Sequence, residues 1–416
     1  MNTTNSKFVW KWALYDWANS AFATSILAGF LPIFFKQYWA ADLSVSASTT
    51  LLGLGHTIIG LLVALSCLGI GILVNHYPIE KKVFSITVTL AIFSTASLAF
   101  VSENHWFWAL VCFGLANIGF STANTLYDAQ LINECPPKDH TRISSLGYSL
   151  GYAGGGALLM FHFLIVIKPH WFGITDLSGL IKWVLLTVAL WWGSFSLPLL
   201  VSPRSQKIIP KKGALNAILK NKSSSLFLIA FWFYMDGVWT IIKMAVDYGL
   251  SLGFSQTHLL AALLITQLIG FPATYLIQKC FKKKNPLHLL IGLLGIYLGI
   301  SLVATTLQTS LHFYLLAASI GLVQGSVQAL SRSFFGSLIE PEHTFAAFGI
   351  YNLVGKFSAI LGPLLIVLTQ TLLSPILSDT TLIIRLGISS IGILFVIGIG
   401  LLIHLNQKIS YTYKKR

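Results

Sequence analysis

The chain has 416 residues, of which 55% are hydrophobic and only 10% are charged. A water-soluble domain has about 25% charged residues, so this chain lacks the charge to cover a soluble surface of its size. The formal net charge of +14 would suggest a nucleic-acid partner in a soluble protein, but membrane topology explains it better, and we expect no nucleic acid.

Apolar runs of about 20 residues, enough to cross a bilayer core, recur along the whole chain. They predict an all-α membrane protein with twelve transmembrane helices, at 9–36, 50–74, 82–102, 106–130, 145–167, 179–201, 224–251, 257–279, 286–307, 311–336, 344–371 and 381–404. The first run is too long for a cleavable signal peptide, and no small-residue cleavage site follows it.

The basic residues are unevenly distributed among the loops. The odd-numbered loops contain only Lys36, Lys168, Lys182 and Arg385, whereas the termini and even-numbered loops contain basic pairs and runs such as KCFKKKNP. The positive-inside rule therefore places both termini in the cytoplasm. We expect a bacterial cytoplasmic (inner) membrane, with a vacuolar membrane as the alternative.

One long polar linker, residues 202–223, divides the chain into two six-helix halves, 1–201 and 224–416. GLANIGFSTANTLYDAQLI (114–132) aligns without a gap with GLVQGSVQALSRSFFGSLI (321–339). Six helices return the chain to its starting side, so the two repeats are parallel rather than inverted. A 6+6 parallel repeat is the architecture expected of the major facilitator superfamily.

Polar residues follow one face of the fourth predicted span and of its repeat counterpart. The fourth span contains Asn117, Ser121, Asn124 and Asp128. The tenth contains Gln324, Gln328 and Ser331, with Arg332 one residue beyond. Their spacing of three and four residues forms a stripe on each helix, which favours two walls of a central cavity. The alternative is that these side chains hydrogen-bond to neighbouring helices and only hold the bundle together.

Charged residues also occur inside three other spans. Asp16 lies in WALYDWANSAF, with Asn19 three residues later on the same face. In span seven, Asp236, Lys243 and Asp247 share a face, and the last two can pair as a structural neutraliser or as a switch.

Lys356 lies well inside span eleven. A charge buried without a partner costs several kcal/mol, so we expect Lys356 to face water, substrate or a carboxylate.

Most of these charged residues are expected to line one cleft, nearer the cytoplasmic side. The predicted substrate and proton pathway consists of Asp16, Asn19, Asn117, Asn124, Asp128, Asp236, Lys243, Asp247, Gln324, Gln328, Arg332 and Lys356.

Enzymatic signatures are missing from the sequence. The four cysteines form no close pairs, and there is no HExxH and no serine elbow. GIYNLVGKF (349–357) resembles a phosphate-binding loop, but it has the wrong glycine spacing and lacks the Ser or Thr. We therefore expect no enzyme, no metal, no cofactor and no ATP-driven pump.

Three segments carry a family resemblance: WALYDWANSAF, FYMDGVWTIIKMAVDYG and QALSRSFFGSLIEPEHTFAAFGIYNLVGKFSAILGPLL. Together they resemble the vacuole-effluxer-like family of the major facilitator superfamily, named after the autophagy-related vacuolar amino-acid effluxer of fungi. The resemblance implies a secondary transporter, with amino-acid efflux as the best-known role of the family.

Two positions depart from the patterns expected of relatives. In GILVNHYPIEKK (71–82), Asn75 replaces the superfamily's usual gating acid, although it can still hydrogen-bond to a helix end. Asp128 stands where we expect an asparagine in relatives, which adds an acid to the membrane.

The leading hypothesis is a proton-coupled or facilitative transporter of small polar metabolites, most of all amino acids. Arg332 or Lys356 would bind a carboxylate, and Asp16 or Asp236 an ammonium group. An exporter of drugs or other organic solutes is an alternative, against which the fixed charges argue. A non-transporting sensor or scaffold is another, although no large cytoplasmic domain is present. The expected partners are a small-molecule substrate, protons and membrane lipid, and the expected state is a monomer.

Overall fold

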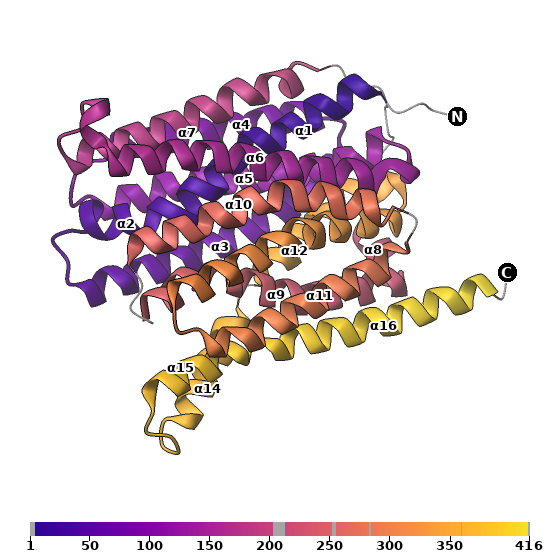
Figure 1. The fold of residues 1–416 in the computed structure, drawn as a ribbon. Helices are drawn as coiled ribbons and strands as arrows, with labels where there is room; N and C mark the ends of the chain where they lie inside the picture. Colours follow the sequence, from indigo (N-terminus) through magenta and orange to yellow (C-terminus); the bar gives the residue numbers. More distant parts are fainter. Residues whose placement is uncertain (1–4, 203–212, 252–254, 283, 359, 415–416) are drawn as a thin grey trace. The chain divides into compact units, whose positions relative to one another are not determined.

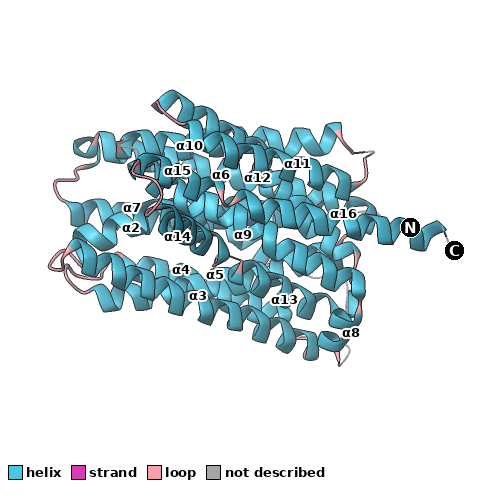
Figure 2. Cartoon of the chain, turned by 90° about the horizontal axis from the view of Figure 1, so that it is seen from below, coloured by secondary structure: helices cyan, strands magenta, loops and turns pink. Residues whose placement is uncertain are grey.

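The computed structural model describes residues 5–202, 213–251, 255–282, 284–358 and 360–414. Within these ranges the regular elements are all helices, and Figure 2 shows no strand among them. The described residues include twelve helical segments that are long and apolar enough to cross a membrane, and each overlaps one of the twelve predicted spans. The predicted all-α membrane fold is thereby confirmed.

The principal helices are labelled in Figure 1, except α13, which is labelled in Figure 2. Their bounds are α1 (Ser6–Ala21), α2 (Leu31–Phe34), α3 (Val45–His76), α4 (Glu80–Leu98), α5 (Trp106–Glu134), α6 (His140–Ile167), α7 (Leu177–Leu200), α8 (Ala214–Lys220), α9 (Lys222–Ser251), α10 (Gln256–Cys280), α11 (Pro286–Val303), α12 (Ser310–Ser337), α13 (Thr344–Phe357), α14 (Leu361–Leu373), α15 (Thr380–Ser389) and α16 (Gly392–Lys414).

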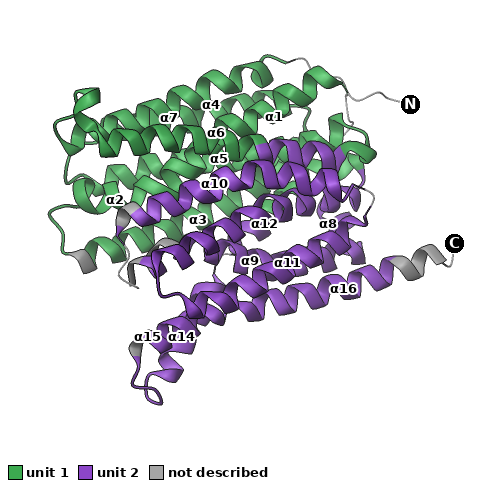
Figure 3. Cartoon of the chain, viewed as in Figure 1, with its two compact units in different colours: residues 1–139, 150–212, 341–353 green, residues 140–149, 213–340, 354–416 purple. Residues whose placement is uncertain are grey.

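Residues group into two compact units, drawn in two colours in Figure 3. Unit 1 comprises 1–139, 150–212 and 341–353, and unit 2 comprises 140–149, 213–340 and 354–416. Each unit thus includes a short segment from the other half of the sequence. The predicted domains 1–201, 202–223 and 224–416 are continuous segments of the chain, and this division stays a prediction.

The helices of the two units pair in the same way. In unit 1, α5 packs against α3 and α4, and α7 packs against α1 and α4. In unit 2, α12 packs against α10 and α11, and α16 packs against α9 and α11. These are the same four pairings at corresponding positions of the two repeats, as the sequence repeat predicts.

Several membrane spans depart from a regular α-helix, among them the first, the eleventh and the twelfth, which consists of α15 and α16. The first span, Ser6–Trp39, includes π-helical turns at Phe22–Phe30 and Phe35–Trp39. The eleventh was predicted as one helix over 344–371, but α13 ends at Phe357 and α14 begins at Leu361. Pro363 lies in the first turn of α14, where its missing N–H costs nothing, so it suits a helix start and not a helix interior.

Candidate functional site

Asp16 is buried on α1 in unit 1, with 7% of its surface exposed. One carboxylate oxygen accepts a hydrogen bond from the Tyr127 hydroxyl of α5 at 3.2 Å. The Tyr127 ring stacks on Trp12 with a centroid distance of 4.2 Å, and the Trp12 indole donates to the Tyr127 carbonyl oxygen at 3.0 Å. The stacked pair fixes the phenol that contacts Asp16.

The polar stripe of α5 is bonded to other helical residues of unit 1. The Asn19 amide donates to Asn124 Oδ1 at 2.7 Å, and the Ser121 hydroxyl donates to Asn117 Oδ1 at 3.3 Å. Asn117 and Asn124 are half-buried, so each retains some accessible surface. Within unit 1 the stripe therefore has the packing role that we considered, and its partial exposure leaves room for cavity lining as well.

Glycines of α6 let this helix approach α1 closely beside Asp16. A Cβ on Gly151 would lie 2.6 Å from Ser20 Oγ and 3.3 Å from Asp16 Oδ1. A Cβ on Gly154 would likewise collide with the carbonyl oxygen and the ring of Trp17. These glycines of α6 thus serve close helix packing.

His162 is fully buried in unit 1, and both of its ring nitrogens have partners. The Thr187 hydroxyl donates to the Trp183 carbonyl oxygen at 2.6 Å, so its oxygen accepts from His162 Nε2 at 2.8 Å. Nδ1 of the ring lies 3.0 Å from Ser25 Oγ, which donates to it. A neutral imidazole satisfies this set, so His162 acts as a packing residue.

The start of α13 is held within unit 1 by α3. Asn75 Oδ1 accepts the backbone N–H of Ala346, in the first turn of α13, at 3.4 Å. A Cβ on Gly71 would lie 2.9 Å from the Gly349 Cα, so the two helices meet at glycines. The replacement of an acid by Asn75 thus preserves a contact to a helix end, as we expected from the sequence.

Asp128, the additional membrane acid, is also bonded to α13. The Asn352 amide donates to Asp128 Oδ2 at 3.3 Å and to the Phe348 carbonyl oxygen at 3.1 Å. Asp128 is 7% exposed. Sequence spacing gave no signal for this pairing, because Asn352 and Asp128 are 224 residues apart in the chain.

Arg332 is buried on α12 in unit 2 and bonded to the first turns of α6. Its Nε donates to Ser144 Oγ at 2.9 Å, and its Nη2 donates to the Ser144 carbonyl oxygen at 3.0 Å. The guanidinium also lies over the Tyr148 ring, 4.3 Å from the centroid. In this structure Arg332 binds protein groups, whereas the sequence suggested a substrate carboxylate.

Asp236 of α9 caps the start of α14 in unit 2. Its carboxylate accepts the backbone N–H groups of Leu361 at 2.8 Å and Gly362 at 2.7 Å, and the Thr240 hydroxyl at 3.2 Å. The side chain is 0% exposed. The fold alone brings these groups together, because Asp236 and Leu361 are 125 residues apart in the chain.

Two lysines lie near this cap. Lys243 lies seven residues after Asp236 on α9, and Lys356 directly precedes Phe357, whose carbonyl oxygen accepts from Trp232 of α9. Lys243 is exposed and Lys356 half-buried, as are Gln324 and Gln328 on α12. The side chain of Asp247 lies outside the described residues, so its predicted pairing with Lys243 stays a prediction.

An apolar hollow lies elsewhere in unit 2 and contains none of the predicted site residues. It is lined by Ile241, Met244, Tyr248, Ile300, Ser301, Ala304, Phe313, Leu316, Ile320, Ile388 and Ile391. The Tyr248 hydroxyl in this lining donates a hydrogen bond to the carbonyl oxygen of Ala304, another lining residue, at 2.6 Å.

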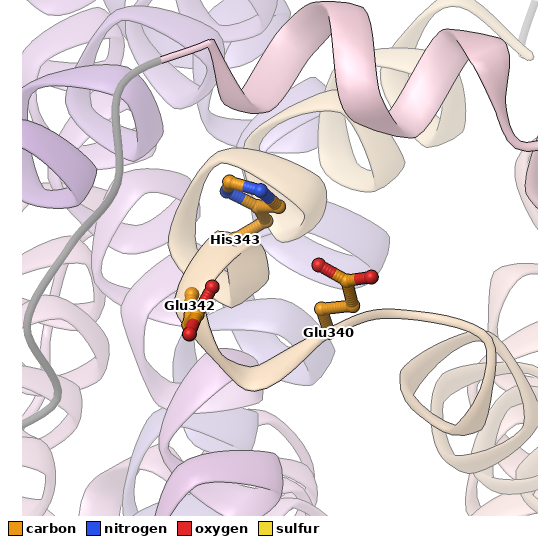
Figure 4. Close-up of side chains that lie close together, drawn as sticks. All are labelled: Glu340, Glu342 and His343. Carbon is orange, nitrogen blue, oxygen red and sulfur yellow. The ribbon is translucent and has the colours of Figure 1, made fainter.

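The turn that precedes α13 contains three potential metal ligands, Glu340, Glu342 and His343, shown in Figure 4. One ligand atom from each lies within 4.8 Å of the others. Glu340 is exposed, and exposed carboxylates are common in turns without a bound ion. We assign no metal here, and the expectation of no metal or cofactor stays a prediction.

Comparisons with known proteins give the family. Residues 133–413 match the model described as "Vacuole effluxer Atg22 like". The Bacillus subtilis (strain 168) protein named "Uncharacterized MFS-type transporter YxiO" is 33% identical over 414 residues, covering 96% of this chain and 95% of that protein. Autophagy-related protein 22-1 of Penicillium rubens is 26% identical over 268 residues, but the match spans only 44% of that longer protein.

Solved structures agree on the fold. The human organic anion transporter MFSD10 superposes with a TM-score of 0.74 at 12% identity, covering 96% of this chain and 100% of that one. The transporter FucP, in its outward conformation, superposes with a TM-score of 0.68 at 12% identity, covering 95% of this chain and 99% of that one. At such low identity these matches establish the fold alone. The family in question is one of transporters and not of enzymes. With its twelve spans, the chain is a multi-pass membrane protein of the vacuole effluxer Atg22-like family within the major facilitator superfamily.

Proposed function

We propose that this protein is a secondary transporter of small polar metabolites, with amino acids as the first class to test and efflux as the expected direction. Transport would proceed by alternating access, either coupled to protons or facilitative. The observation that carries the proposal is the set of buried ionisable side chains within membrane spans. Asp16 and Asp128 are each 7% exposed, and such residues are expensive in a bilayer unless they serve a function.

The lysines of unit 2 are the best candidates for a substrate anion. Lys243 lies on α9 and Lys356 near the end of α13. The two lysines carry two positive charges, whereas Asp236 carries one negative charge. A substrate carboxylate would complement this positive region, and Arg332, held by Ser144, would have a structural role.

Asp16 is the candidate ligand for an ammonium group or a proton in unit 1. It is bonded to the Tyr127 hydroxyl and lies beside Gly151. A carboxylate this buried changes its proton affinity readily when its surroundings change. The distribution of basic residues supports cytoplasmic termini. A monomer in a bacterial cytoplasmic membrane is part of the proposal.

The test is uptake of a mixed pool of labelled amino acids by proteoliposomes, with and without an imposed pH gradient. Concentrative uptake that requires the gradient and is lost in Asp16→Asn would support proton coupling through Asp16. Uptake without a gradient would support a facilitator. Lys356→Ala should raise the half-saturation concentration about tenfold or more if Lys356 binds the carboxylate.

A further inference from the structure

The break in span eleven exposes backbone groups in the middle of a membrane segment. α13 ends at Phe357 and α14 begins at Leu361. The last carbonyls of one helix and the first N–H groups of the next lack partners within their own helices. Lipid offers no hydrogen bonds, so such a break persists only where protein groups satisfy them.

Two side chains of α9, one turn apart, supply these hydrogen bonds. The Trp232 indole donates to the Phe357 carbonyl oxygen at 3.3 Å, at the end of α13. Asp236 accepts the N–H groups of Leu361 and Gly362, at the start of α14. A donor therefore faces the carbonyl end and an acceptor faces the N–H end. Residues four apart on a helix lie on one face, so α9 presents both groups to the break.

The contact is close enough to constrain the residue type at the start of α14. A Cβ on Gly362 would lie 2.7 Å from the Thr240 Cβ and 2.9 Å from Asp236 Oδ1. Thr240 in turn donates to Asp236. Gly362 thus lets the α14 backbone reach the carboxylate.

The break lies next to the point where the chain passes between units. Residues 341–353 belong to unit 1, and residues from 354 onward belong to unit 2. A span that joins two units which move during transport needs a point at which its backbone can change direction, and hinges lie at the ends of helices.

We propose that Trp232 and Asp236 are positioning residues that keep span eleven divided into two helices, and that this division sets the rate of the transport cycle. Asp236 acts on the α14 backbone and not on the transported solute. The rate effect rests on the proposed transport function, whereas the geometric effect does not.

The experiment uses the full-length protein in lipid, with the four native cysteines replaced and spin labels at Glu340→Cys and Leu372→Cys. Both labelled positions are exposed and lie at the two ends of span eleven. Asp236→Ala should shift or broaden the distance distribution between the labels, and Asp236→Asn, which retains one acceptor oxygen, should change it less. Trp232→Phe removes the indole donor and should give a smaller shift in the same sense.

Asp379→Ala is the matched control. Asp379 caps α15 through the N–H groups of Thr381 at 2.9 Å and Leu382 at 3.1 Å, but it is exposed to solvent. Water can replace that cap, so the label distances should be unchanged. An Asp236→Ala distribution identical to that of the unsubstituted protein would overturn the proposal, whatever the transport assay shows.

The transport readout separates a positioning role from a proton-carrying one. A positioning role predicts a maximal rate reduced about tenfold in Asp236→Ala, with an unchanged half-saturation concentration and partial recovery in Asp236→Asn. A proton carrier would lose gradient-driven transport as fully in Asp236→Asn as in Asp236→Ala, and that result would refute the positioning role.

Discussion

Asp16 and Asp236 occupy the first helix of their respective repeats, yet the two carboxylates have different surroundings. Asp16 accepts the hydroxyl of a side chain, Tyr127, and lies beside a glycine of α6. Asp236 accepts two backbone N–H groups and a threonine hydroxyl, and its side chain is completely buried. The same residue type at a corresponding place thus contacts a side-chain hydroxyl in one unit and helix backbone in the other.

The difference indicates how a repeat diverges. A carboxylate bonded to a side-chain hydroxyl can exchange that partner for a solute or a proton without unpairing a backbone group. A carboxylate bonded to backbone groups cannot leave without exposing them, because an unpaired buried N–H costs about 1–3 kcal/mol. We therefore expect Asp16 to govern coupling and Asp236 to govern helix geometry.

The largest expected effect is on stability, when each carboxylate is removed in turn. Asp236→Ala leaves one buried and one part-buried N–H group without their acceptor and should lower the free energy of unfolding by about 3 kcal/mol. Asp16→Ala should lower the free energy of unfolding by about 1 kcal/mol. Thermal unfolding of the two purified variants in the same detergent checks this, and equal shifts of the midpoint would remove the distinction between the two sites.

A smaller effect should follow from adding a methyl group beside each carboxylate. Gly362→Ala brings a Cβ against the β-branched Thr240 and should destabilise the protein by about 2 kcal/mol. Gly151→Ala meets the Ser20 hydroxyl, which can rotate away, and should cost less than about 1 kcal/mol. Gly292→Ala, where a Cβ meets nothing within 4 Å, serves as the control. A Gly151→Ala variant as unstable as Gly362→Ala would contradict this ranking.

The smallest effect should come from deleting one hydroxyl at each site. Tyr127→Phe removes the phenol that donates to Asp16 and should cost about 1 kcal/mol. Thr240→Val should cost about 0.5 kcal/mol, since Asp236 keeps both backbone donors. In the uptake assay, Tyr127→Phe should alter the pH dependence and Thr240→Val should not. The reverse pattern would place coupling at Asp236.

The sequence predicted the number of spans and the repeat because both depend on patterns that extend over many residues. Hydropathy over about 20 residues locates a span, but it reads straight through a short break such as the one after Phe357. Pro363, in the first turn of α14, was the signal that was missed.

The site residues were recognisable singly, because a charge within an apolar run is conspicuous. Their partners were not recognisable, because Arg332 and Ser144 are 188 residues apart and Asp236 and Leu361 are 125 apart. Spacing along one helix gives the face on which a side chain lies, but not the backbone that it meets. Only the assembled fold shows that Asp236 contacts a helix end.

The exchange of short segments between the units has a consequence for biosynthesis. Unit 1 is made almost entirely from the first half of the chain, yet it also contains residues 341–353. The ribosome translates those residues long after α1 to α7 have entered the membrane. Unit 1 is therefore an incomplete bundle until α13 is made. Before then, Asn75 Oδ1 lacks the Ala346 N–H that it accepts in the folded protein, and Gly71 is not yet covered by Gly349. The final assembly step of the first unit coincides with the synthesis of the last quarter of the protein.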